Sequence, residues 1–220
     1  MEHPLLYIQI PGLQQWPHVT YSWLVMAVLV LASFLITRGL QTIPYGGQNA
    51  MEALFELIQG FMDDVMGHEG RRYFPLIFTL AIYIFLSNLL GLVPGAMSPT
   101  SNINTNVGCA LTVFLTTHYI GAREHGWRYV RHFTGPILWL APIMVPIEII
   151  THLARPLSLS LRLFGNIRGE DLVLIILAGL VPLVIPSFMI VFAVFTSFVQ
   201  AFVFVLLSMI YLAGSLEHAH

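Results

Sequence analysis

Ionisable side chains interrupt the long apolar segment 134–183, where each of them is costly to bury. They are Glu148, His152, Arg155, Arg162, Arg168, Glu170 and Asp171. An arginine at the centre of a transmembrane helix costs roughly 2.5–3.5 kcal/mol on an insertion scale, and ionisable groups in such helices usually serve a function. Arg168 and Asp171 also have the i, i+3 spacing of an ion pair on a helix. Mutual neutralisation, with other long side chains reaching the lipid headgroups, is therefore the alternative interpretation.

Arg162 has no such local explanation, because no acidic residue lies three or four positions before or after it. At 100° per residue, a helix would place Arg162, Asn166 and Glu170 within about 80° of one another. Arg155 shares this face unless Pro156 breaks the helical phase. The guanidinium stays charged at any biological pH, and a nearby opposite charge lowers the pKa of a carboxyl group. We therefore expect Arg162 to face acidic groups from elsewhere in the chain or from another subunit.

The composition restricts the class of protein. The chain has 220 residues, of which 57% are apolar and 9% are charged. Globular domains carry about 25% charged residues, so this composition excludes a soluble protein and a disordered tail. Nine arginines, eleven acids and no lysine leave no basic patch for a nucleic acid. The single cysteine, Cys109, excludes a disulfide framework and a cysteine-based zinc site. We expect neither a metal nor a cofactor.

The apolar segments predict an all-α integral membrane protein. The candidate crossings are 20–37, 73–93, 107–122, 134–183 and 187–214. Backbone groups in lipid require helices or a closed barrel, and segments this long and uniform favour helices. The last segment would form a helix of about 42 Å, which must tilt in a bilayer core of about 30 Å. From the residues alone, 134–154 and 157–183 are either two crossings or one long tilted element. No repeat or linker divides the chain, so 1–220 is expected to form one membrane domain.

Residues 49–66 have a different pattern, with polar side chains on one helical stripe and apolar side chains on the other. The polar stripe consists of Glu52, Glu56, Gln59 and Asp63. Asn49 followed by Glu52 resembles a capping box at a helix start. The pattern predicts an amphipathic helix in the plane of the membrane interface. Packing against the soluble domain of a partner is the alternative.

The placement of arginines predicts an orientation in the membrane. Six arginines lie between the first two spans or after the third span: Arg38, Arg71, Arg72, Arg123, Arg128 and Arg131. The outer N-terminal segment 1–19 and the loop 94–106 contain none. By the positive-inside rule, we expect the N-terminus outside and the 123–132 loop in the cytoplasm.

Two other classes of membrane protein would also explain buried charges. A secondary transporter that works alone usually shows two related halves, and the sequence shows no such repeat. An intramembrane metal-dependent hydrolase would need a histidine pair such as H-E-x-x-H, which the sequence lacks. His118, His125 and His132 are spaced by seven residues. We interpret them as solvated histidines of an arginine-rich loop.

The motif RPLSLSLRLFGN at 155–166 resembles the signature of subunit a of the F-type ATP synthase membrane sector. Further matches to this family follow the same order along the chain. They are SNL at 87–89, PTSNINT at 99–105, QAFVF at 200–204, IYL at 210–212 and the acidic, histidine-containing end LEHAH at 216–220. The end resembles chloroplast-type and related bacterial members.

The resemblance implies a stator ion-channel subunit that is no enzyme on its own but couples proton flow to ATP synthesis. Its implied partners are the ring of subunit c, the stator stalk subunit b, the other ATP synthase subunits and the bilayer of a bacterial plasma membrane. Arg162 falls on the family's essential arginine, which faces the carboxylates of the rotating ring. Two half-channels, one open to each side, meet the ring beside it. The resemblance also implies a single crossing for 134–183, in a tilted hairpin with 187–214, hence five crossings and a cytoplasmic C-terminus.

Other site residues follow from the same resemblance. Glu148 matches a position linked to the inner half-channel, and Asn166 and Gln200 match polar positions near the arginine. Asp171 matches the acidic position of the outer half-channel, and Glu170 lies beside it. Two positions depart from the family pattern. Ala193 stands where several bacterial members have a histidine, and Asn102 stands where some relatives have an aspartate. We therefore expect the outer proton path to depend on Glu170 and Asp171, with a slight preference for Asp171.

Overall fold

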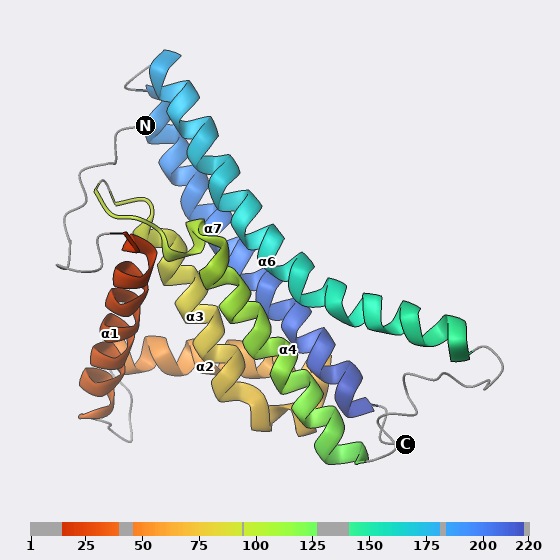
Figure 1. Cartoon of the computed structure of the whole chain (residues 1–220). Coiled ribbons are helices and arrows are strands. Elements are labelled where there is room, and N and C mark those ends of the chain that lie inside the picture. The colour runs from red at the N-terminus through yellow and green to blue at the C-terminus, as the bar shows by residue number, and fades with distance from the viewer. Residues whose placement is uncertain (1–14, 40–45, 94, 127–140, 181–183, 218–220) are drawn as a thin grey trace.

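The computed structural model describes residues 15–39, 46–93, 95–126, 141–180 and 184–217, and these ranges contain helices and no strand (Figure 1). The α-helices are α1 (Pro17–Thr37), α2 (Gly47–Met66), α3 (Phe74–Leu90), α4 (Ile103–His125), α6 (Ala141–Leu180) and α7 (Val184–Glu217). The 3₁₀ helix η1 (His68–Tyr73) joins α2 to α3, and η2 (Pro99–Ser101) precedes α4. The expected all-helical fold is confirmed for these ranges.

Three helical stretches are long and apolar enough to cross a membrane, namely Pro17–Thr37, His68–Leu90 and Ser187–Leu216. They coincide with the expected spans 20–37, 73–93 and 187–214. α1 exposes large apolar side chains such as Val30, Leu31 and Leu35. A helix that is apolar all round and unburied within its own chain belongs in lipid. α4 covers the expected 107–122 segment, but α4 and α6 carry more polar side chains and are not part of this set.

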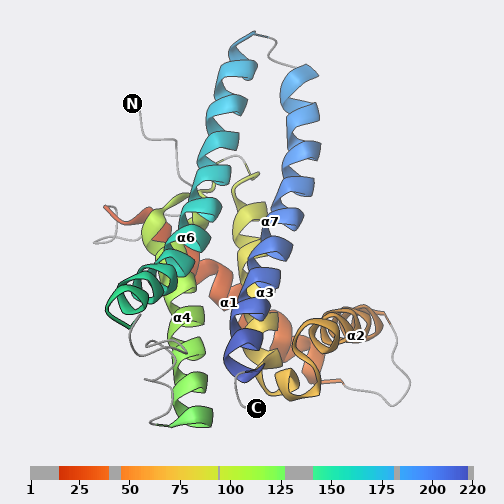
Figure 2. The ribbon, with the colours of Figure 1, turned by 90° about the vertical axis from the view of Figure 1, so that its right-hand side faces the viewer.

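α6 is one helix of 40 residues, so the described part of the expected 134–183 segment is a single continuous element. Residues 134–140 and 181–183 lie outside the described ranges. Pro146 and Pro156 lie inside α6, where proline removes a backbone hydrogen bond and bends a helix. Figure 1 shows that α6 changes direction partway along its length. Beyond that point α6 and α7 run side by side as a long hairpin that extends past the other helices (Figure 2).

α2 runs across the direction of α1 and α3 (Figure 1). Its apolar side packs inside the chain, because Phe55 contacts the rings of Phe74 and Phe78, and Met62 is fully buried. The expected helix at 49–66 is therefore present and amphipathic. The expected capping box is wrong: α2 begins at Gly47 without a side-chain cap, so Asn49 already lies inside the first turn.

Two apolar clusters hold the helices together. The first joins α3, α4, α6 and α7 through Leu80, Ile84, Cys109, Ala110, Val113, Leu159, Leu163, Ala201 and Phe204. The second joins α2, α3, α4 and α7 through Met62, Met66, Ile77, Ile120, Val205, Met209 and Leu212. We call the second one the methionine-rich cluster. Together these contacts fix how α6 and α7 are rotated about their axes.

Candidate functional site

The rotation of α6 decides where its polar residues point. Leu159, Leu163 and Ile167 have the i, i+4, i+8 spacing of one helical stripe, and all three are buried against the neighbouring helices. Arg162 and Asn166 lie on a different side of α6 and are exposed. Because the side of α6 with Leu159, Leu163 and Ile167 is buried, the side with Arg162 and Asn166 faces away from the first apolar cluster.

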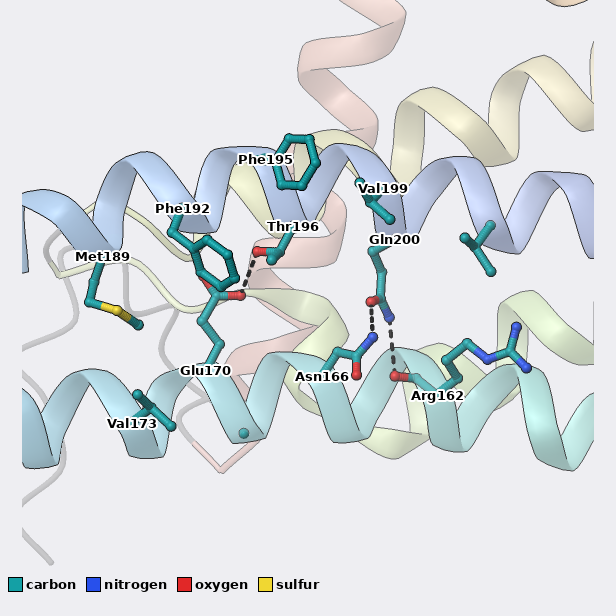
Figure 3. Close-up of a pocket in the computed structure, with 12 residues that line it drawn as sticks. Arg162, Asn166, Glu170, Val173, Met189, Phe192, Phe195, Thr196, Val199 and Gln200 are labelled. Carbon is teal, nitrogen blue, oxygen red and sulfur yellow. Dashed lines mark hydrogen bonds between the residues drawn. The ribbon is translucent and has the colours of Figure 1, made fainter.

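Gln200 of α7 connects the two helices of the hairpin (Figure 3). Its Nε2 donates to the backbone carbonyl of Arg162 at 3.1 Å, and its Oε1 accepts from Nδ2 of Asn166. The Gln200 side chain is buried, with 8% of the residue exposed. A buried amide needs partners for both its donor and its acceptor, and here α6 supplies both. The expectation that Asn166 and Gln200 lie near Arg162 agrees with this geometry.

Arg162 lies beside an open cavity of about 400 Å³ between α6 and α7. Asn166, Glu170 and Gln200 line the same cavity, together with apolar side chains of both helices (Figure 3). Within the described residues, no carboxylate lies within 4 Å of the Arg162 guanidinium and no hydrogen bond to it is present. The cavity thus presents a fixed positive charge whose counter-charge the described part of the chain does not provide.

Glu170 lies further along the same cavity, and Asp171 does not line it. Thr196 of α7 donates from Oγ1 to Oε2 of Glu170 at 3.1 Å. The other oxygen, Oε1, is buried and has no hydrogen-bond partner among the described residues. A buried carboxylate oxygen without a donor is costly, so this position favours a protonated carboxyl group or a water molecule. Of the two acids expected on the outer path, Glu170 therefore lies beside the Arg162 cavity, whereas Asp171 is exposed on another side of α6.

Arg168 points to η2 instead of forming an ion pair with Asp171. Its Nε donates to the backbone carbonyl of Ser101 at 3.0 Å. Behind that carbonyl, the turn before α4 is held by buried hydrogen bonds. We call this the η2 cluster: Thr100 Oγ1 donates to Asn88 Oδ1 at 2.6 Å, and Asn106 Nδ2 donates to the Thr100 carbonyl at 2.8 Å. The neutralising Arg168–Asp171 pair that the i, i+3 spacing suggested is not among the ion pairs of the described chain.

Glu148 lies away from the Arg162 cavity and pairs with His152, one helical turn along α6. Nε2 of His152 and Oε1 of Glu148 are 3.1 Å apart. The His152 ring faces the ring of His118 on α4, with centroids 5.2 Å apart. His118 lies on a helix and packs against Phe114, so its interpretation as a solvated loop histidine is wrong. The side chain of His125 and all of His132 lie outside the described parts of the chain.

Thr196 was not predicted from the sequence as part of the site, and neither was the contact between Glu148 and His152. Thr196 lies four residues before Gln200, and this i, i+4 spacing on α7 could have indicated that it faces α6. His152 lies four residues after Glu148, which is the spacing of an ion pair on one helix face. Ala193, where several relatives have histidine, is fully buried, and its carbonyl accepts a hydrogen bond from Thr196.

Comparison with known proteins identifies the family of the chain. The family model described as ATP synthase A chain matches residues 19–213, which include every residue of the cavity. The chain belongs to the ATP synthase A chain family. The resemblance inferred from residues 155–166 is therefore confirmed.

Curated members of the family match over the whole chain. ATP synthase subunit a 3 of Pelobacter propionicus is 51% identical, and the alignment covers 100% of both chains. ATP synthase subunit a of Geotalea uraniireducens is 50% identical, and that of Geobacter sulfurreducens is 49% identical, each with the same full coverage. Identity at this level over the full length extends the family likeness from the motifs to the complete fold.

Proposed function

We propose that this chain is the stator subunit through which protons cross the membrane in an F-type ATP synthase. The observation that carries the proposal is Arg162, a fixed positive charge beside an open cavity with no carboxylate within 4 Å in the described chain. The names of the relatives place them in ATP synthases. The missing counter-charge is then supplied by the carboxyl groups of a ring of subunit c.

The physical chemistry of Arg162 supports this role. A ring carboxyl group in lipid stays neutral, because burial disfavours its charged form. When rotation brings it to Arg162, the nearby positive charge lowers its pKa by roughly 1–3 units, and it releases its proton. Arginine keeps its own charge throughout, so a proton cannot pass through Arg162 from one half-channel to the other. Ions must therefore travel with the ring.

Two half-channels on either side of Arg162 complete the path. Glu170 serves the outer half-channel in this proposal, because it lines the cavity with Arg162 and has one buried oxygen free to accept a proton. Asp171, adjacent but exposed, is the alternative outer relay. Glu148 serves the inner half-channel through its contact with His152. Asn166 and Gln200 hold α6 and α7 at the spacing that keeps Arg162 in the cavity.

The membrane arrangement in this proposal has five crossings. α6 and α7 form a tilted hairpin that faces the ring, and they present large exposed apolar side chains such as Leu161, Phe188 and Phe195. α2 lies at the inner interface, with the N-terminus outside and the C-terminus in the cytoplasm of a bacterial plasma membrane. The stator stalk subunit b and the other ATP synthase subunits are the remaining partners.

Replacement of Arg162 tests the proposal in the assembled complex. Arg162→Ala should abolish ATP synthesis driven by a proton gradient and also ATP-driven proton pumping in inverted vesicles, while the ring still co-purifies. Arg38→Ala is the matched control. Arg38 is exposed just beyond the end of α1, and its guanidinium lies over the Phe34 ring of the same helix. Normal coupling in the Arg162→Ala complex would overturn the proposal.

A further inference from the structure

Four ionisable side chains meet where α4 packs against α6, away from the Arg162 cavity. They are His118 on α4 and Glu148, His152 and Arg155 on α6. The two imidazole rings have centroids 5.2 Å apart, His152 contacts Glu148 at 3.1 Å, and Arg155 and His152 line the same small cavity. Tyr211 of α7 closes the group, with its ring 5.3 Å from the Arg155 guanidinium. We call this set the histidine cluster.

We propose that His118 and His152 form a proton relay that transfers protons between Glu148 and the interior of the inner half-channel. This inference rests on the proposed function and adds two residues to it. In the pumping direction, a proton from the inner solution reaches Glu148 and passes to the neutral imidazole of His152, which becomes an imidazolium. The proton then leaves through His118 or through water toward the ring, and the imidazole returns to its neutral form.

The burial of the cluster supports this direction of transfer. Glu148 is partly exposed, whereas His152 is buried, with 7% of the residue exposed. The contact between them therefore leads from the surface to the interior of the helix bundle. A small cavity of about 10 Å³ adjoins His152 on the side of Pro156 and Leu159. This volume is about the minimum for one water molecule, and Thr117, Arg155 and Tyr211 supply polar atoms around it.

The chemistry of imidazole explains why histidines are useful here. A free carboxyl group has a pKa of about 4.3 and an imidazole about 6.5. Near neutral pH a glutamate is therefore protonated about a hundred times less often than a histidine, so a glutamate alone rarely holds a proton that it could pass on. Glu148 can instead attract protons and stabilise the imidazolium of His152 as an ion pair.

The test measures ATP-driven proton pumping by the assembled complex in inverted vesicles. The pH is varied in the solution that bathes the cytoplasmic face of the membrane. Complexes that carry His152→Gln or His118→Gln should pump protons at the wild-type rate at about pH 6 and about tenfold more slowly at about pH 8. Added imidazole should restore part of the lost rate. His68→Gln is the matched control, because the His68 side chain is 85% exposed.

Each outcome of this test either supports or overturns the relay through His118 and His152. A pH profile equal to that of the wild type, or a loss that is the same at every pH and is not rescued by imidazole, would overturn the relay. If His152→Gln fails to assemble, the partly exposed His118 carries the test through its own substitution. Arg162→Ala in the same assay separates the two proposals. Normal pumping in that variant contradicts the proposed function, whereas its loss combined with normal histidine variants contradicts only the relay.

Discussion

The Nε2 atom of Gln200 donates a hydrogen bond to the backbone carbonyl of Arg162 at 3.1 Å. A backbone carbonyl inside a helix is normally bonded only to the amide four residues later, so this contact binds α7 to the residue that carries the positive charge beside the cavity. The Oε1 atom of the same Gln200 side chain accepts a hydrogen bond from Nδ2 of Asn166. The backbone of Arg162 is thus held in place, while its guanidinium forms no hydrogen bond or ion pair within the described residues.

Gln200→Met should weaken this link. The substitution keeps a similar side-chain volume, but it leaves the amide of Asn166 without its acceptor and removes the bond to the Arg162 carbonyl. A typical hydrogen bond contributes about 0.5–1.5 kcal/mol to stability, and this variant loses two of them. We expect a lower midpoint of thermal unfolding for the purified complex and a reduced rate of ATP-driven pumping. Gln59→Met on α2, far from the cavity, should change neither quantity, and equal effects at the two sites would contradict the interpretation.

Glu170 and Asp171 offer a comparison between adjacent acids. Glu170→Gln should reduce ATP-driven proton pumping strongly, by about tenfold or more, because the glutamine cannot take up a proton beside the Arg162 cavity. Asp171→Asn should have a smaller effect, since Asp171 does not line the cavity. The reverse order would favour the family-based expectation for Asp171. Full pumping in the double variant would show that the outer path uses neither acid.

The orientation can be checked with single cysteines in a Cys109→Ser background. Cysteines replace His3, Ala122 and Ala219; Ala122 is exposed near the end of α4, whereas the nearby Gly126 has a φ of 52° that a cysteine tolerates poorly. A membrane-impermeant thiol reagent on intact cells should label position 3 alone. Labelling of position 122 but not of position 3 would reverse the orientation, and labelling of position 219 would require a sixth crossing.

Asp63 provides a prediction about pH at the end of α2. Arg71 donates from Nε to Oδ1 of Asp63 at 2.8 Å and from Nη2 to Oδ2. These hydrogen bonds hold the pKa of the Asp63 carboxyl below its usual value, and the charges of Arg71 and His68 add to the effect against partial desolvation. A lowered pKa in the folded state contributes stability above the unfolded pKa of about 3.9. That contribution is lost as the pH falls through the lower folded value.

Asp63→Asn should therefore reduce hydrogen-exchange protection at the end of α2 near neutral pH. The difference from the wild type should shrink as the pH falls below the unfolded pKa of about 3.9, and it should vanish once the pH lies below the lowered folded pKa, where the wild-type carboxyl group is protonated as well. Asp64→Asn is the matched control, because Asp64 is adjacent and exposed. A difference that persists in acid would mean that the asparagine perturbs α2 by some route other than charge.

The helices were largely predictable from the sequence, because lipid exposure requires long apolar runs. α7 extends the expected span 187–214 by three residues at each end, whereas α1 begins three residues before the expected span 20–37 and ends at the same residue. The start of α2 was misjudged, since Asn49 and Glu52 match a capping pattern that the chain does not use. The continuity of α6 through Pro146 and Pro156 could not be derived from the residues, because proline more often ends a helix than bends it.

The candidate site was predictable where it follows the helical repeat and obscure where it depends on contacts between helices. One cavity is lined by Arg162, Asn166 and Glu170, as their i, i+4, i+8 spacing on a single helix predicts. The partners of these residues come from another helix, and no pattern within α6 could specify Thr196. In the same way, His118 and His152 are 34 positions apart in the sequence. Only the packing of α4 against α6 brings their rings together.

The η2 cluster and the methionine-rich cluster lie toward opposite ends of α3, which contributes Asn88 to one and Ile77 to the other. These positions are about 16 Å apart along the helix. Hydrogen bonds are directional and fix one geometry, whereas methionine side chains adapt to changes in shape. In mechanical terms, the molecule is stiff at one end and compliant at the other. A lateral load on the α6–α7 hairpin should therefore be absorbed by repacking around Met62 and Met209, while the register of α6 against η2 is preserved.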